Sequence, residues 1–408
     1  MKRFVSFLFI ITFLVAACAP QTPVTVLPEV ILPTATAESA TEASALTETE
    51  AAPEAALAPQ GTPSPAGIDA PIIEGPSIVN IEMLDEVFGW AVTEQKIIRT
   101  NDGGVTWYDV TPPGLNEAGY LVFADFLDTD HAWVQFPDMN LYPNGGKFYR
   151  TSDGGLTWDQ FDTPFSGGSL HFVDESNGWM MADLGVGAGS MAVSIFKTAN
   201  GGATWERAYS NDPNIEGAGD SLPLGGIKNF ILPLDTDTAW VGGVIYAPGE
   251  TYLYRSSDGG KTWSNVQIAL PEGASQSELS VIAIEFLTET DGLLAIRKMS
   301  ETPELLIYKT TDGGNTWERL IVDFSGFGIL ETPSAEELVF YAGDQFYVTT
   351  DAGATVQQIA PELPFGTSVV DMSFVNSQTG WVLYADPSGT WILYKTTDSG
   401  ATWIQQAP

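Results

Sequence analysis

The sequence predicts an all-β protein, a single seven-bladed β-propeller of four-stranded antiparallel blades, after a signal peptide and a disordered linker. An eight-residue motif recurs seven times at intervals of 39 to 58 residues, which is the length of one four-stranded blade. The 41 glycines and 11% aromatic residues favour many short strands joined by tight turns. We expect residues 1–17 to be the leader, 18–70 the linker and 71–408 the propeller.

The N-terminal residues predict export. Lys2 and Arg3 precede an apolar run from Phe4 to Val15 that is too short to span a bilayer as a mature helix. Val15-Ala16-Ala17-Cys18 resembles the lipobox of bacterial lipoproteins, which implies a lipid on Cys18 and anchoring to the outer face of the cytoplasmic membrane or cell envelope. A plain secretory signal or a buried cysteine is the alternative. Cys18 is the only cysteine, so no internal disulfide forms.

Residues 18–70 predict a disordered tether. Positions 19–66 are almost entirely Ala, Thr, Pro, Glu, Ser, Leu and Val, with no Lys or Arg. Such a segment cannot bury enough apolar surface to offset its ordering entropy. As a coil it would span roughly 40 Å and hold the folded domain clear of the membrane.

The charge of the chain is strongly acidic, with 52 Asp and Glu against 16 Lys and Arg. A surface this negative repels phosphate backbones, so nucleic-acid binding is disfavoured. It would suit a cationic partner or bound cations, or it would serve only solubility outside the cell.

The recurring motif, which we call the box, has the form Thr/Ser-x-Asp-x-Gly-x-Thr-Trp. The first copy is Thr100 to Trp107. Two glycines supply the positive φ of a tight hairpin turn, and the Asp side chain accepts hydrogen bonds from the turn's own amides. Seven near-identical sites indicate a structural role. The box acids are Asp102, Asp153, Asn200, Asp258, Asp312, Asp351 and Asp398.

A second signature precedes most boxes, a Gly-Trp or Ala-Trp pair that opens a short apolar strand, as at Gly89-Trp90. Eleven of the twelve tryptophans occupy this position or the end of a box, and only Trp391 does not. We therefore expect the tryptophans to be core residues. The sixth box ends in Val356, which predicts the weakest blade.

These boxes resemble the Asp-box, or bacterial neuraminidase repeat, superfamily over about residues 75–408. With its Gly-Trp strands the chain looks most like the photosystem II assembly/stability factor family, which implies a non-enzymatic propeller that helps assemble membrane complexes. That family's partner-binding face is rich in arginine. Here five of the seven arginines flank boxes, Arg3 is in the leader, and only Arg297 lies elsewhere.

The long loops predict where a partner would bind. They connect the second and third strands of blades, or consecutive blades, and so emerge on the face opposite the boxes. Loops on a rigid scaffold carry function disproportionately. Aromatic and carboxylate side chains there would suit a sugar or a basic peptide. The candidates are Asp138, Tyr142, Asp183, Tyr246, Glu250, Arg297, Tyr384 and Asp386.

Enzyme chemistry finds less support. A sialidase needs three converging arginines, and a xyloglucanase-like hydrolase uses two carboxylates across a cleft between two propellers. His131 and His171 are the only histidines, so a zinc site is disfavoured. Asp128-Thr129-Asp130 and Asp235-Thr236-Asp237 do not continue into a calcium loop. We expect no cofactor and no metal.

The sequence therefore predicts a monomeric, lipid-anchored binding or assembly scaffold that recruits an unidentified protein or carbohydrate partner. The alternative is a glycoside hydrolase of sialidase-like or xyloglucanase-like type.

Overall fold

The structure, a computed structural model, describes residues 68–115, 122–322 and 324–406, which belong to one compact unit. The only helical element in these ranges is a 3-10 turn, η2 (Ala274–Gln276), and everything else is strand, turn or irregular. No helix of the described ranges is long and apolar enough to cross a membrane. The predicted leader, Cys18 and nearly all of the tether lie outside the described residues.

The strands pair with their sequence neighbours and form antiparallel, four-stranded meanders. This confirms the predicted all-β class. The first strands are β2 (Ile78–Met83), β3 (Gly89–Thr93), β4 (Ile97–Thr100), β5 (Trp107–Asp109), β6 (Phe123–Phe126), β7 (Ala132–Pro137), β8 (Gly146–Thr151), β9 (Asp159–Thr163), β10 (Gly168–Phe172), β11 (Gly178–Gly187), β12 (Ser190–Thr198) and β13 (Glu206–Ser210).

The C-terminal half continues this pattern. Its strands are β14 (Ile227–Pro233), β15 (Ala239–Ile245), β16 (Tyr252–Ser256), β17 (Ser264–Asn265), β18 (Leu279–Phe286), β19 (Gly292–Lys298), β20 (Glu304–Thr310), β21 (Glu318–Arg319), β23 (Gly328–Glu331), β24 (Leu338–Ala342), β25 (Gln345–Thr349), β26 (Gln357–Ile359), β27 (Val369–Phe374), β28 (Gly380–Ala385), β29 (Trp391–Thr396) and β30 (Ile404–Gln405).

Three pairings extend the simple meanders. A short strand, β1 (Ile72–Ile73), pairs with β5 at the outer edge of the first sheet. The β14–β17 and β18–β21 meanders merge into one nine-stranded sheet because β15 pairs with β18. The ninth strand of that sheet, β22 (Phe324–Ser325), pairs with β20.

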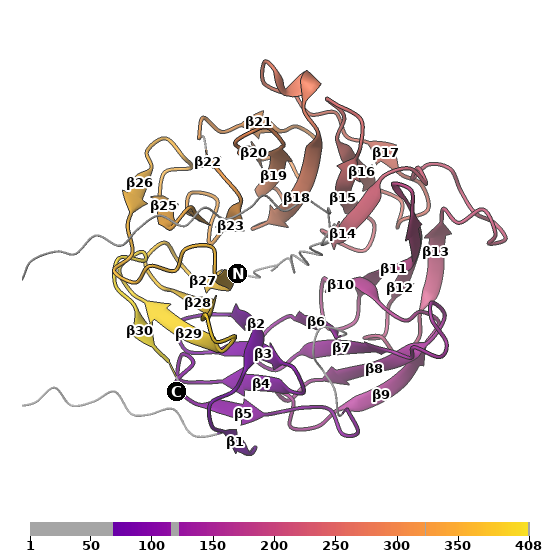
Figure 1. Cartoon of the computed structure of the whole chain (residues 1–408). Coiled ribbons are helices and arrows are strands. Elements are labelled where there is room, and N and C mark those ends of the chain that lie inside the picture. Colours follow the sequence, from indigo (N-terminus) through magenta and orange to yellow (C-terminus); the bar gives the residue numbers. More distant parts are fainter. Residues whose placement is uncertain (1–67, 116–121, 323, 407–408) are drawn as a thin grey trace, which may run out of the picture. The chain divides into compact units, whose positions relative to one another are not determined.

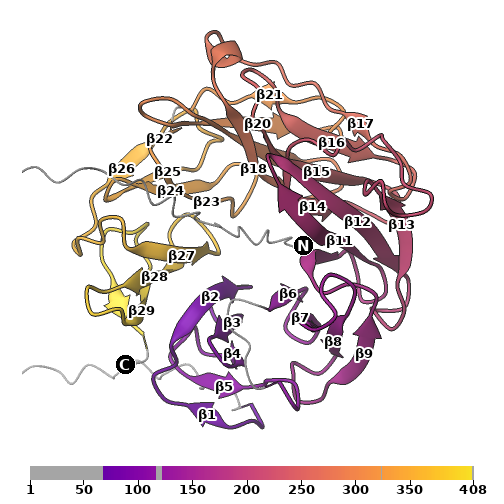
Figure 2. The same cartoon turned by 45° about the vertical axis from the view of Figure 1, so that its right-hand side comes forward.

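Within this unit the meanders succeed one another around a centre (Figures 1 and 2). The first strand of each meander, from β2 through β27, lies nearest the centre, and the last strand lies outside. The buried apolar residues form separate clusters, and each cluster joins two consecutive meanders. A further cluster joins Trp381 and Leu393 of the last meander to Ile81 and Trp107 of the first. Each sheet therefore buries its faces against its neighbours, as sheets must to form a core.

Among the long loops that the sequence predicts, the one at Asp183–Ser190 is not a loop in the structure. Asp183–Ser190 is strand for most of its length, because β11 continues to Gly187 and β12 starts at Ser190. A bulge between Asp183 and Gly185 shifts the register, and pairing then resumes at Gly185↔Ala192. No proline interrupts this stretch, so the ladder continues to a two-residue tip at Ala188 and Gly189, both with positive φ.

Candidate functional site

The boxes are closed by their own hydrogen bonds. Asp102 Oδ1 accepts from Thr106 N at 2.8 Å and from Thr100 Oγ1 at 2.9 Å, and Thr100 Oγ1 accepts from Gly104 N at 3.0 Å. Gly103 and Gly104 have φ of +76° and +90°, which glycine adopts without steric cost. The same bonds recur at the boxes of Asp153, Asp258, Asp312, Asp351 and Asp398.

The third box keeps this geometry without a charge. Asn200 Oδ1 accepts from Thr204 N at 2.9 Å, and Asn200 Nδ2 donates to Thr204 Oγ1 at 2.9 Å. In five of the six charged boxes a carboxylate oxygen instead accepts from that threonine hydroxyl, as Asp312 does from Thr316 at 2.7 Å. Hydrogen bonds from Thr316 and Thr310 lower the pKa of Asp312 to about 2.

The tryptophans that open the second strands connect consecutive meanders. Trp90 Nε1 donates to the carbonyl oxygen of Asp128 at 3.0 Å, and Trp381 Nε1 donates to Gly103 O at 2.9 Å. Both side chains are fully buried. Arg99 lies over the ring of Trp90 and donates to Gly154 O at 3.3 Å in the next meander. Residues around the boxes therefore hold neighbouring sheets together.

The predicted partner-binding residues divide into three groups in the structure. Three carboxylates cap their own turns. Asp138 Oδ1 accepts from Asn140 N, Asp183 Oδ1 from Gly185 N, and Asp386 Oδ1 from Ser388 N and Thr390 N, all at 2.8–2.9 Å. These acids therefore shape the loops.

Two further candidates are packed between meanders. Arg297 Nη2 donates to Gly328 O at 3.0 Å, its guanidinium lies over the Phe327 ring, and burial lowers the pKa of Arg297. Tyr384 packs against Phe365 with 5.5 Å between the ring centroids.

The remaining candidates are exposed. Tyr142 is 49% exposed and Tyr246 is 61% exposed, and Glu250 is exposed as well. Burial raises the pKa of Tyr142, and the nearby carboxylate of Asp183 raises it further. A Cβ on Gly189 would lie 3.2 Å from the Tyr246 ring. The structure thus brings Tyr142, Asp183 and Tyr246 into one region. Arg297, Tyr384 and Asp386 belong to later meanders and lie outside this region.

This region also exposes other apolar side chains. Gly226 N donates to Gly189 O and Met191 N donates to Leu224 O, which places the loop before β14 beside the β11–β12 tip. We call the exposed apolar residues of this region the apolar arc. They are Met139, Leu141, Tyr142, Val186, Leu224 and Tyr246.

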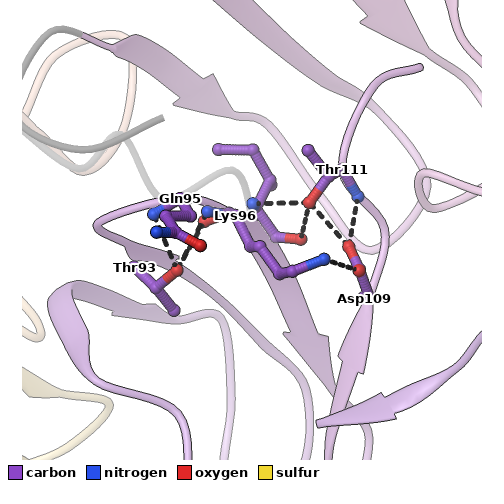
Figure 3. Close-up of polar contacts among 6 residues, drawn as sticks. Thr93, Gln95, Lys96, Asp109 and Thr111 are labelled. Carbon is purple, nitrogen blue, oxygen red and sulfur yellow. Dashed lines mark hydrogen bonds and ion pairs between the residues drawn. The ribbon is translucent and has the colours of Figure 1, made fainter. Parts of the chain in front are cut away.

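The corresponding turn of the first meander is short and polar. Thr93 Oγ1 accepts from Gln95 N and Lys96 N, and the Lys96 ammonium pairs with Asp109 (Figure 3). Burial would raise the pKa of Asp109, but hydrogen bonds from Lys96 and Thr111 hold it below its usual value. This turn satisfies its own polar groups and presents no apolar side chain comparable to the arc.

Six polar side chains and one leucine occupy equivalent positions on the innermost strands, which lie nearest the centre of the unit. Each lies on the innermost strand, opposite the second residue of its neighbour strand, as in Glu82↔Trp90 and Asp125↔Trp133. We call these register-equivalent positions the inner belt. Its members are Glu82, Asp125, His171, Leu232, Glu285, Glu331 and Ser373.

Several belt side chains bridge to the next meander. Asp125 accepts from Phe172 N at 2.7 Å, Glu331 from Phe374 N at 3.2 Å, and Ser373 from Met83 N at 3.0 Å. Asp371, two residues before Ser373, accepts from Ile81 N at 2.9 Å. These bonds satisfy backbone donors on the free edges of innermost strands.

Burial dominates the electrostatics of the belt. It raises the pKa of Glu331 to about 8 and those of Asp125 and Asp371 to about 7. It lowers the pKa of His171 to about 4, so this imidazole is neutral at pH 7 although its Nδ1 lies 3.7 Å from Asp125 Oδ1. The pKa of Glu82 is raised well above its usual value by burial and by Asp125, Glu331 and Asp371.

Two cavities follow the same strands. One of about 130 Å³ is lined by residues that include Asn80, Glu82, Glu331 and Asp371. A larger one, of about 920 Å³, is lined by the turns between first and second strands, on the side opposite the long loops. Its acids are Asp85, Glu86, Asp128, Asp174 and Glu175.

The acids of the larger cavity also shape turns. Asp85 Oδ1 accepts from Val87 N and Phe88 N, and Asp174 Oδ1 accepts from Ser176 N and Asn177 N. No three His, Cys, Asp or Glu residues of the described ranges lie close enough together to hold a metal ion.

Sequence reasoning missed the inner belt. Glu82, Asp125, Glu331 and Asp371 did not appear among the candidates, and His171 was considered only as a zinc ligand. A signal existed, because a polar residue interrupts the apolar end of the innermost strand at Ile81-Glu82-Met83 and Ala124-Asp125-Phe126. Alternation alone does not distinguish such a residue from one on a solvated face.

No protein-family model matches the chain. A xyloglucanase from Paenibacillus sp. is 24% identical over 322 residues, which cover 72% of this chain and 28% of the xyloglucanase. The chain thus matches less than a third of that relative's length.

Two solved structures share the architecture. YCF48 bound to D1 peptide is 17% identical with a TM-score of 0.51, over 81% of this chain and 95% of that one. The GH74 xyloglucanase from Xanthomonas campestris is 14% identical with a TM-score of 0.54, over 82% of this chain and 55% of that one. The fold is that of a β-propeller. At these identities the likeness establishes the fold alone.

Proposed function

We propose that this chain is a lipid-anchored, extracytoplasmic scaffold, built as a single seven-bladed Asp-box propeller, that binds a protein partner through the apolar arc. The arc is the observation that carries the proposal. Six apolar side chains, each 40% exposed or more, gather on the loops of three consecutive meanders. Exposed apolar residues that cluster on one face mark interaction sites more often than scattered ones do.

Two further observations support a protein partner. Tyrosine and methionine, both present in the arc, are enriched in interface cores. The solved structure of YCF48, which shares the architecture of this chain, is bound to D1 peptide, and this supports a peptide or protein as the partner.

The alternative is a glycoside hydrolase, favoured by the sequence likeness to a xyloglucanase. A retaining or inverting hydrolase needs two carboxyl groups facing one cleft. In this chain Asp125, Glu331 and Asp371 accept hydrogen bonds from neighbouring backbones. Three of the five acids of the larger cavity, Asp85, Asp128 and Asp174, cap turns. Because these carboxylates are engaged in hydrogen bonds within the fold, they favour the scaffold over the hydrolase. A screen on xyloglucan and chromogenic glycosides separates the two, because turnover abolished by one carboxylate substitution would establish the hydrolase.

Site-specific photo-crosslinking in the source cells tests the face. A crosslinking residue at Tyr142 or Tyr246 should capture one defined protein, and the same residue at Leu156, a box tip that is 47% exposed, should not. Tyr142→Ser with Tyr246→Ser should abolish capture by a crosslinker at Met139. Equal capture from Leu156 would exclude the arc as the specific site.

The anchor is tested separately. We expect Cys18→Ser to move the protein from the membrane fraction to the soluble fraction and to abolish labelling by a fatty-acid analogue. Retention in the membrane fraction with unchanged labelling would contradict lipidation of Cys18.

A further inference from the structure

The smaller cavity is lined by acceptors that lack donors. Asn80 Nδ2 donates to Asp371 Oδ2 at 2.9 Å, which fixes the orientation of the amide. Asn80 Oδ1 is then buried without a hydrogen-bond partner. A buried acceptor of this kind costs about 1–3 kcal/mol when it is left unpaired.

Glu82 lines the same cavity. It is 4% exposed, and within the described ranges its carboxylate has no hydrogen bond and no ion pair. The groups that act on it are Asp125, Glu331 and Asp371, all acids. No described Lys or Arg contributes to the pKa of Glu331 or Asp371 either. Unpaired carboxylates are rarely this deeply buried.

The size and spacing of these groups restrict what could neutralise them. Since no three acids of the described ranges can share a metal ion, a bare divalent cation finds no complete shell. The volume of about 130 Å³ corresponds to that of about four water molecules. An ammonium donates three hydrogen bonds and a guanidinium five, in directions that reach separated oxygens.

The two cavities follow one another along the same strands. Asn80 to Met83 line the smaller cavity, and the next residues, Leu84 to Glu86, line the larger one. Asp371 to Phe374 and then Val375 and Asn376 follow the same order. The larger cavity's acids concentrate cations at its mouth.

We propose that the smaller cavity binds an alkylammonium or guanidinium group, with Glu82 as its main anchor and Asn80 Oδ1 as a second acceptor. The group belongs either to a free polyamine or to a basic side chain of a peptide. This site is on the far side of the ring from the apolar arc and goes beyond the proposed function.

Calorimetry on the full chain in detergent solution, at 150 mM salt, tests the site. The probes are spermidine, butylammonium, guanidinium and a lysine-containing hexapeptide, with Ca²⁺ as the metal arm. We expect one saturable site for at least one organic cation and at least about tenfold weaker binding by Glu82→Gln, because a charge-assisted hydrogen bond is lost. The matched control is Glu301→Gln, at an exposed loop residue, which should bind as wild type does.

Protons provide a second readout. The groups that face the site are Glu82 on β2, Asp125 on β6, Glu285 on β18, Glu331 on β23 and Asp371 on β27, with His171 on β10 beside Asp125. A bound cation favours the ionised forms of the five carboxyl groups and the neutral form of His171. Binding should therefore release protons at pH 7 and become tighter from pH 6 to pH 8.5.

Stability separates a binding defect from misfolding. Without ligand, Glu82→Gln should unfold at a higher temperature than wild type at pH 8, because it removes charge repulsion. Should this variant fail to fold, Glu331→Gln replaces it in the same assay. Three results would each overturn the proposal. The first is equal affinity of wild type and Glu82→Gln, and the second is binding without proton release. The third is binding of Ca²⁺ that Glu82→Gln abolishes, with no organic cation bound. Capture of spermidine but not of the hexapeptide would identify a free polyamine as the ligand, and the reverse result a basic side chain.

Discussion

Trp381 Nε1 donates a 2.9 Å hydrogen bond to the carbonyl oxygen of Gly103, 278 residues earlier in the chain. The bond crosses the seam between the last meander and the first. Asn80 and Asp371 make a second contact across this seam at 2.9 Å. Each of the two sheets is formed from one continuous stretch of chain, so closure depends on side chains and on the cluster around Trp381.

Trp381→Phe should therefore destabilise the ring. The substitution keeps an aromatic ring but leaves the Gly103 carbonyl unpaired, which we expect to cost about 1–3 kcal/mol in the free energy of unfolding. Urea denaturation measures the loss. The control, Trp391→Phe, changes a tryptophan outside the two repeat positions. Equal losses in the two variants would argue against a special role for the seam.

The geometry of the boxes predicts one substitution that leaves the stability of the protein unchanged and one that lowers it. Asn200→Asp should leave stability within about 0.5 kcal/mol, because the acceptor of the Thr204 amide is retained. Asp102→Ala removes the acceptor of the Thr106 amide and should cost about 1–2 kcal/mol, as the loss of a capping side chain does. Thermal unfolding of both variants tests the pair, and a large loss in Asn200→Asp would show that the third box needs its neutral side chain.

The inner belt predicts that stability falls as pH rises. The folded pKa of Glu331 is about 8 and that of Asp371 about 7, both above the values of an unfolded chain near 4. Between these limits the folded state binds more protons than the unfolded state, so the free energy of unfolding decreases with pH. Denaturation at pH 5.5 and pH 8.5, in the absence of amines, should show this loss.

Glu331→Gln tests whether Glu331 causes this dependence of stability on pH. The amide cannot ionise, so the variant should lose less stability than wild type between pH 5.5 and pH 8.5. A slope unchanged by the substitution would assign the pH dependence to other groups.

Lys228 holds the loop before β14 in place. It is 2% exposed, and its Nζ donates to the carbonyl oxygens of Met191 at 2.9 Å, Leu224 at 2.8 Å and Gly226 at 3.0 Å. Lys228→Met keeps the length of the side chain but leaves these carbonyls unpaired, and we expect a loss of about 2–4 kcal/mol. Hydrogen exchange should accelerate first at Leu224 to Gly226. Loss of stability without faster exchange there would contradict this account.

The sequence was informative where a pattern repeats. The spacing of the boxes predicted the all-β class, and Gly89-Trp90 and its equivalents predicted second strands that the structure contains. All five tryptophans at these positions are fully buried. A turn residue or a core aromatic is specified by its immediate neighbours, so local sequence suffices for it.

The inner belt could not be predicted in this way. The pKa of Glu82 depends on Asp371, almost three hundred residues later. Its place in the belt depends on the register of β2 against β3. The larger cavity likewise forms where turns of separate meanders meet, as Glu86 and Asn376 do. The smaller cavity forms where strands of the first meander and of the last three meet. Such sites arise from assembly of the ring, which no local pattern encodes. Two loop candidates, Arg297 and Tyr384, lie on β19 and β28. Asp183–Ser190 is mostly strand because its ladder continues beyond a bulge.

Strand β1 carries a mechanical consequence. It joins the first sheet through only two residue pairs, Ile72↔Tyr108 and Ile73↔Trp107, while a third contact runs from Asp109 N to Pro71 O. Tension exerted by the preceding chain reaches the ring through these few bonds. These bonds would break first and release several residues of the chain. A sudden force would therefore be absorbed at β1 before it strains the seam.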